Sequence, residues 1–158
     1  MAAHVLVVHP PVSLGRDFID YPWVADLGAV QLAAVMRPQA NVTLVDSCAL
    51  PGSSVYPLKD GRTLLGATVD DVIASIHAAD TERQVDLAVV AFSPFHRPPA
   101  RDGVLGDLLQ QMRRLLGETP ILLADCPHGK MRRRRARGSH LQLTSPGVAL
   151  GVDAGTRN

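Results

Sequence analysis

The chain has 158 residues, enough for one domain with a substantial core, and 46% of them are hydrophobic while 20% are charged. No apolar run approaches the roughly 20 residues that cross a bilayer, and the start of the chain lacks the basic region of a secretory signal. Its two cysteines are too few for a disulfide scaffold or an all-thiolate metal site. We therefore expect a cytoplasmic protein with no membrane partner.

The net charge of +1 hides an uneven distribution along the chain. Residues 129–158 carry seven basic residues and one acid, whereas residues 1–128 carry nine basic and fourteen acidic residues. This asymmetry predicts a folded domain over 1–128 and a basic tail over 129–158 that composition favours as disordered. A second interpretation of the tail stays open: a shift of the reading frame between Cys126 and Met131, which would truncate a longer relative.

The first predicted element is a buried strand over Val5–Val8, a continuous β-branched and aliphatic run. Two prolines and a long loop follow it. A helix is then predicted over 26–36, and Pro38 ends it. The predicted apolar side of this helix consists of Leu27, Val30, Ala34 and Val35.

The second predicted strand covers Val42–Val45 and ends at Asp46, and residues 47–66, rich in Gly, Pro and Ser, are predicted to form a long loop. Thr68 is a suitable N-cap for the next helix, with acids in its first turn. The stripe of this amphipathic helix is formed by Val69, Val72, Ile73 and Ile76.

The third predicted strand covers 85–92, and a helix capped by Asp102 and closed by Gly117 follows it. The fourth strand covers 119–124. Strands that alternate with helices predict a doubly wound, flavodoxin- or Rossmann-like α/β fold, with a mainly parallel sheet of four to five strands and helices on both faces. Ligands of such folds bind at the carboxyl ends of the strands.

Three common functions of this fold lack their motifs here. A dinucleotide site needs a glycine-rich turn after the first strand, where this chain has His9-Pro10-Pro11. A receiver domain needs a phosphoacceptor Asp after the third strand, where Ser93-Pro94 stands. A P-loop motif for ATP or GTP occurs nowhere in the chain.

Several segments, in this order, resemble one protein family. They are VLVVHPP, YPWVADLGAVQLAAVMR, VTLVDSCALPGS, LLGATVDDVIASI, VDLAVVAFSPF and PILLADC. Together they resemble the N-terminal cobalamin (B12)-binding domain of B12-dependent radical S-adenosylmethionine enzymes. The resemblance covers residues 4 to about 128 and implies a corrinoid cofactor that lies across the strand ends.

The resemblance also implies where the corrinoid contacts lie. A wide macrocycle needs a broad, preformed platform with few polar anchors. We expect this platform after the first strand, with Phe18, Tyr21 and Trp23 further along the same loop. Ser93 is the expected contact near the nucleotide tail. The full set of candidate cofactor-binding residues is Pro10, Pro11, Val12, Ser13, Leu14, Asp46, Ser93, Phe95 and Asp125.

Other side chains are expected to have ordinary roles. Asp46 either binds a ligand or caps its own loop, and these two alternatives stay open. His77 and His96 are interpreted as surface groups, and Cys126 as a small buried side chain. The histidine motif D-x-H-x-x-G, which supplies a cobalt ligand in related B12 domains, is missing from the loop after the first strand. We therefore assign no metal ligand and no catalytic residue from the sequence.

The family's radical chemistry needs a C-x-x-x-C-x-x-C motif for an iron–sulfur cluster. This motif does not occur in this chain. A segment for the barrel that would carry the cluster and the S-adenosylmethionine site is missing as well. The expected function is therefore a corrinoid-binding module that is not catalytic alone. The alternative is a ligand-free interaction domain with a nucleic-acid-contacting tail at Arg132–Arg135. We favour a solvated charge run there, because no aromatic residues interleave it.

Overall fold

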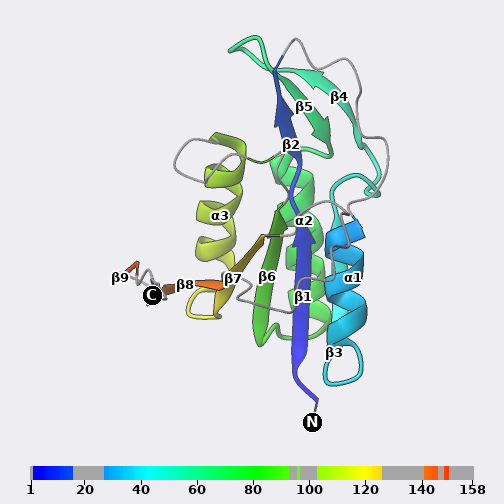
Figure 1. Ribbon diagram of the computed structural model, residues 1–158, viewed down its shortest axis with the longest axis vertical. Coiled ribbons are helices and arrows are strands. Elements are labelled where there is room, and N and C mark those ends of the chain that lie inside the picture. Colours follow the sequence, from blue (N-terminus) through cyan, green and yellow to red (C-terminus); the bar gives the residue numbers. More distant parts are fainter. Residues whose placement is uncertain are drawn as a thin grey trace, which may run out of the picture.

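The computed structural model describes residues 2–15, 27–92, 96 and 103–125, together with the backbone of 141–145 and 148–149. Four strands form a parallel sheet in the order β3-β1-β6-β7, which continues antiparallel into β8 and β9 (Figure 1). The strands are β1 (His4–His9), β3 (Asn41–Asp46), β6 (Leu87–Phe92), β7 (Ile121–Asp125), β8 (Leu141–Ser145) and β9 (Val148–Ala149).

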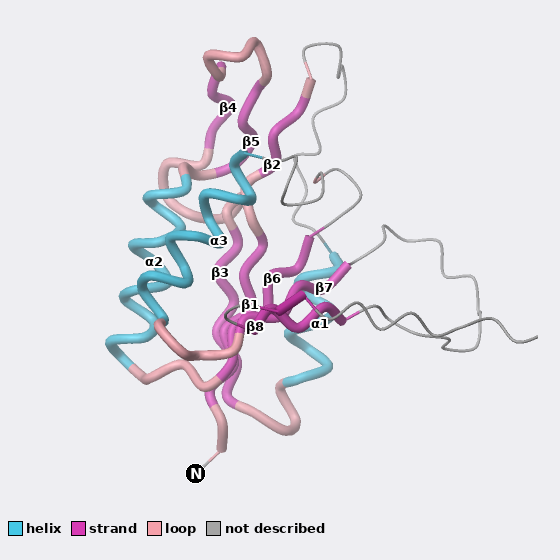
Figure 2. Tube along the Cα trace, turned by 90° about the vertical axis from the view of Figure 1, so that its left-hand side faces the viewer, coloured by secondary structure: helices cyan, strands magenta, loops and turns pink. Residues whose placement is uncertain are grey.

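Helices cover both faces of this sheet, as Figure 2 shows from the side. They are α1 (Leu27–Met36), α2 (Val69–Glu82) and α3 (Gly103–Leu116). α2 and α3 lie on one face and α1 on the other. The doubly wound α/β fold predicted from the sequence is therefore confirmed, with the strand order of flavodoxin-like sheets.

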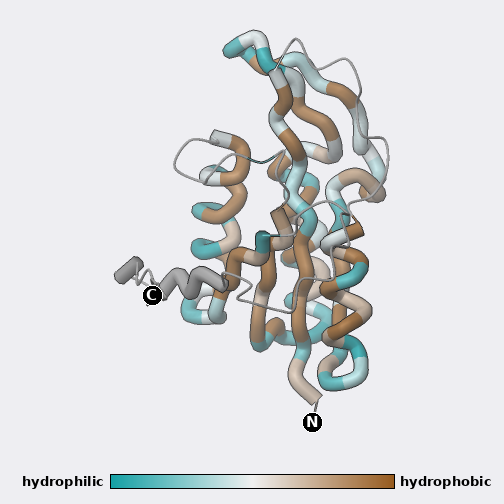
Figure 3. Tube along the Cα trace, viewed as in Figure 1, coloured by the Kyte–Doolittle hydropathy of each residue, from teal (hydrophilic) through white to brown (hydrophobic). Residues whose placement is uncertain are grey.

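The core has two layers because successive side chains of a strand point to opposite faces. On β1, Leu6 and Val8 pack toward α2 and α3, while Val5 and Val7 pack toward α1. Figure 3 shows the hydrophobic residues concentrated along β1 and β6, the two central strands. Both faces of these strands are buried, which explains why their sequences show no alternation of polar residues.

The predicted starts and ends of the helices agree with the structure where it describes them. Thr68 and Asp71 form a capping box at the start of α2, in which each side chain bonds the other residue's backbone N–H. Gly117 closes α3 with a positive φ of 56°. Val72 and Ile76 of the predicted stripe are fully buried. Asp102, the predicted cap of α3, lies outside the described residues.

The prediction of which side of α1 packs against the sheet is wrong. Leu27 and Val35 are 68% and 72% exposed, and the residues buried against the sheet are Ala29 and Ala33. Small side chains let the helix backbone lie close to the sheet, so packing selected the alanine side over the bulkier one. Periodicity was a weak guide here because both sides of α1 are apolar.

The predicted long loops after β1 and β3 are also wrong in part. β2 (Val12–Leu14), β4 (Ser54–Pro57) and β5 (Thr63–Gly66) form a separate antiparallel sheet in the order β2-β5-β4. We call it the small sheet. It stands beyond the end of the parallel sheet in both views (Figures 1 and 2). Two loops that leave neighbouring strands therefore pair with each other.

Candidate functional site at the carboxyl edge

The carboxyl edge, where the parallel strands end, carries the most unusual group of polar side chains in the described chain. β1 ends at His9 and β3 ends at Asp46, and the two residues are paired directly in the sheet register. Adjacent parallel strands that end together place their last side chains side by side. Two polar residues that are 37 positions apart in the sequence thus become neighbours.

His9 and Asp46 form a buried pair. The Nδ1 of His9 lies 2.9 Å from Oδ1 of Asp46, and the two side chains are only 4% and 8% exposed. The same carboxylate oxygen accepts a hydrogen bond of 3.0 Å from the backbone N–H of Cys48. Asp46 therefore caps the turn after β3, which is one of the two roles expected for it.

The two charges stabilise each other. Burial alone would lower the pKa of His9, but the hydrogen bonds and charges of Asp46 and Cys48 raise it to about 9. Burial alone would raise the pKa of Asp46, but the hydrogen bonds from His9 and the Cys48 amide lower it. At neutral pH the pair is therefore an imidazolium that donates to a carboxylate.

Cys48 and His96 complete the cluster around this pair. The potential ligand atoms of His9, Asp46 and Cys48 all lie within 4.8 Å of one another. The His96 ring stands edge-on to the His9 ring, with centroids 5.9 Å apart. Its Nε2 lies 3.3 Å from the carbonyl oxygen of Pro10. His96 is 5% exposed, so its interpretation as a surface group is wrong, whereas His77 is exposed as expected.

Two buried hydroxyl groups lie in the segments that follow β1 and β3, Ser13 on β2 of the small sheet and Ser47 in the turn after β3. Within the described structure, Oγ of Ser13 and Oγ of Ser47 are buried without a hydrogen-bond partner. Ser47 follows Asp46 directly, and its backbone N–H donates to the carbonyl of His9. The guanidinium of Arg62, which directly precedes β5, donates to the Ser13 carbonyl. Unpaired buried hydroxyls are costly, so these two deserve a functional explanation.

Besides Asp46, which lies in the buried cluster, the sequence-predicted contact residues fall into three groups. Pro10 to Leu14 are all buried, and Val12 and Leu14 pack against Leu65 of the small sheet. Asp125 is exposed at the end of β7. The remaining predicted contacts lie outside the described residues, namely Ser93, Phe95 and the loop residues Phe18, Tyr21 and Trp23. The Arg132–Arg135 run and Cys126 lie outside them as well.

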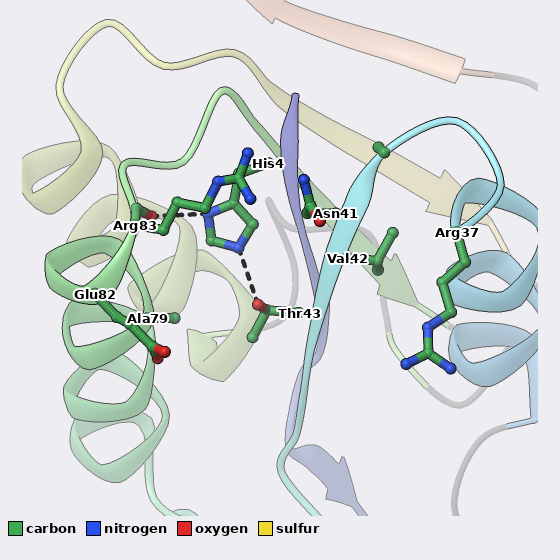
Figure 4. A pocket seen from close by; sticks show the side chains of 9 residues that line it. His4, Arg37, Asn41, Val42, Thr43, Ala79, Glu82 and Arg83 are labelled. Carbon is green, nitrogen blue, oxygen red and sulfur yellow. Dashed lines mark hydrogen bonds between the residues drawn. The ribbon is translucent and has the colours of Figure 1, made fainter. Parts of the chain in front are cut away.

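A polar cavity of about 340 Å³ lies at the opposite, amino end of β1 and β3 (Figure 4). Its central side chain, His4, donates from Nδ1 to the carbonyl of Arg83 at 2.7 Å, and its Nε2 lies 2.9 Å from Oγ1 of Thr43. Figure 4 shows the imidazole held between these two partners. Because His4 thereby ties β1 to β3 and to the end of α2, we assign it a structural role.

The sequence reasoning missed His9, Cys48 and His96 as members of one cluster. From the sequence alone, His9 has no assigned role beyond its place before the two prolines, where a dinucleotide site would have a glycine-rich turn. The usable signal was that two neighbouring strands each end on a polar residue, His9 and Asp46. Nothing local in the sequence pointed to His96.

Comparison of the chain with protein-family models, with curated proteins and with solved structures finds no match. The resemblance to cobalamin-binding domains therefore stands on the quoted segments alone. Among the described residues, no helix combines the length and apolar character needed to cross a bilayer.

Proposed function

We propose that this chain is a cobalamin-binding module that carries the corrinoid at the carboxyl edge. The observation that supports the proposal most is topological. Four of the segments that carry the family resemblance contain strands β1, β3, β6 and β7 and the residues that follow each strand. These strands are parallel, so their carboxyl ends lie at the same edge of the sheet. This edge is where doubly wound folds bind their ligands.

The residues at this edge fit a corrinoid in one specific respect. Corrinoids carry amide side chains around the macrocycle, and such groups pair with hydroxyls. Ser13, on β2 and two residues after the second proline, has a buried Oγ with no partner in the described structure. A bound amide would satisfy this hydroxyl and remove its desolvation cost.

The small sheet also supports the proposal, because it flanks the carboxyl edge and could form one side of the corrinoid site. Pro10 is fully buried, and β2 continues from it into the antiparallel pairing with β5. The turn after β1 is therefore held by both sheets, and a pre-organised wall lowers the entropic cost of binding a large ligand. The bound corrinoid would supply a transferable methyl group or a radical step to a separate catalytic domain.

The test is a visible spectrum of the purified protein after incubation with hydroxocobalamin and desalting. We expect retained absorbance at about one corrinoid per chain. Ser13→Ala should weaken retention, because it removes the proposed anchor while preserving the fold. Ser47→Ala is the matched control: it removes the other unpaired hydroxyl and should retain the corrinoid.

A folded wild-type protein that elutes colourless would overturn the proposal. Circular dichroism on the same samples establishes that each variant is folded. In that case the alternative, an interaction domain with a nucleic-acid-contacting tail, would be tested by filter binding. Deletion of 130–137 should then abolish retention of the nucleic acid, with a strong dependence on salt.

A further inference from the structure

We propose that His9, Asp46 and Cys48 form a binding site for a zinc-like divalent metal ion, distinct from the cobalt of the corrinoid. The three residues offer an imidazole nitrogen, a carboxylate oxygen and a sulfur atom within 4.8 Å of one another. Two come from the ends of adjacent strands, and the third lies in the turn that Asp46 caps.

Tetrahedral coordination requires small changes in the spacing of the three ligand atoms, which now lie within 4.8 Å of one another. Zinc bonds of about 2.0–2.3 Å place neighbouring ligand atoms about 3.3–3.8 Å apart. The Nδ1 of His9 and Oδ1 of Asp46 are 2.9 Å apart because they share a hydrogen bond. Replacing the proton of this bond by the larger ion requires a separation only about half an ångström wider, a change that side-chain torsions can supply. The bridging proton thus marks the place where the metal would lie.

The donor set selects the class of metal. A thiolate together with an imidazole favours borderline-soft ions such as Zn²⁺ over Mg²⁺ or Ca²⁺, which prefer oxygen ligands. Three protein ligands leave the fourth position open for water or another ligand. Cys48 is only half-buried, so the ion has a route in from its side, while His9 and Asp46 are buried.

Binding exchanges protons for the metal. The Nδ1 proton of His9 leaves to solvent, together with any proton that Cys48 carries, and Cys48 and Asp46 bind as a thiolate and a carboxylate. No electron transfer is involved. The positive charge of the imidazolium is replaced by that of the ion, so the buried carboxylate stays compensated after the exchange.

The test uses reduced, chelator-treated protein without corrinoid and Co²⁺ as a spectroscopic substitute for Zn²⁺. We expect one equivalent to produce a thiolate-to-cobalt charge-transfer band and the visible bands of tetrahedral coordination. Cys48→Ser should abolish the charge-transfer band. It should also weaken Zn²⁺ binding, measured by competition with a chromophoric chelator, by at least about tenfold.

Two variants serve as matched controls. Cys126→Ser removes the other cysteine and His77→Ala removes an exposed histidine, and both should bind as the wild type does. A charge-transfer band that survives in Cys48→Ser, or a folded wild type that takes up no Co²⁺, overturns the proposal. Because no corrinoid is present, this result is independent of the hydroxocobalamin experiment, and either can fail alone.

Discussion

At the scale of single residues, the carboxyl edge combines two features that are costly in isolation. A buried imidazolium and a buried carboxylate each lose the free energy of hydration. The charge-assisted hydrogen bond between His9 and Asp46 offsets this loss. Buried hydroxyls of Ser13 and Ser47 lie in the segments that follow. Such concentrations of perturbed polar groups are typical of functional sites.

The His9–Asp46 pair predicts how stability depends on pH in metal-free protein. The pKa of His9 rises from 6.5 to about 9 on folding, so its stabilisation is complete below pH 6.5 and is lost as the pH rises through about 9. The pKa of Asp46 is lowered from 3.8, so its contribution is lost as the pH falls through the acidic range. Urea unfolding midpoints should therefore decrease between pH 6.5 and about 9.

The control for this pH effect is Asp46→Asn, which keeps the shape of the side chain but removes the charge that raises the pKa of His9. Its midpoint should be lower at pH 6.5 and should change less up to pH 9. An equal slope in both proteins over this range would contradict the pairing.

Gly66, at the end of β5, is predicted to tolerate no side chain. Its φ is +113°, and a Cβ there would lie 2.9 Å from Oγ of Ser47. Gly66→Ala should lower the free energy of unfolding by about 1–3 kcal/mol, because strain adds to the close contact. Gly103→Ala is the control, since a Cβ at this helical position would meet nothing within 4 Å. Urea titration of both variants measures the difference, and equal effects would argue against the contact.

At the scale of elements, packing decides which of two apolar helix sides is buried. α3 has one clear stripe, and Leu105, Leu108 and Met112 on it are fully buried. α1 is apolar all round, and the small residues Ala29 and Ala33 face the sheet. Periodicity therefore predicts the orientation of α3 and leaves that of α1 open.

This contrast between the helices predicts unequal costs for the same substitution. Leu108→Ala should destabilise the protein by about 2–5 kcal/mol, because it leaves a cavity among α2, α3 and the sheet. Leu27→Ala should cost less than about 0.5 kcal/mol, because this side chain is 68% exposed. Thermal or urea unfolding of the pair measures the difference. A large loss of stability for Leu27→Ala would contradict this expectation, because it would mean that the Leu27 side chain is buried in the folded protein.

At the scale of the whole molecule, the described core is contained in the first part of the chain. All members of its three hydrophobic clusters lie between Val5 and Ala124. β8 adds backbone pairing to the outer edge of β7. The division into a domain over 1–128 and a tail over 129–158 stays a prediction.

Truncation after residue 128 tests this division. We expect the shortened protein to unfold in a single cooperative urea transition, because the buried clusters are retained. Losing β8 exposes the edge of β7, so self-association should increase, as measured by light scattering. Loss of the cooperative transition would mean that the tail is part of the fold.

The sequence by itself determined the parallel strands, the N-cap of α2 and the glycine that closes α3. These features depend on local patterns such as the apolar runs of β1 and β6, the Thr68–Asp71 capping box and the glycine after α3. Local patterns are readable because each depends on residues a few positions apart.

Only the tertiary structure decided the contact between His9 and Asp46, the pairing of β2 with β5 and the buried side of α1. The physical reason is the same in all three cases. Each depends on residues far apart in the chain, whose relative position follows from strand register and from the volume available between packed elements. No local pattern encodes these quantities.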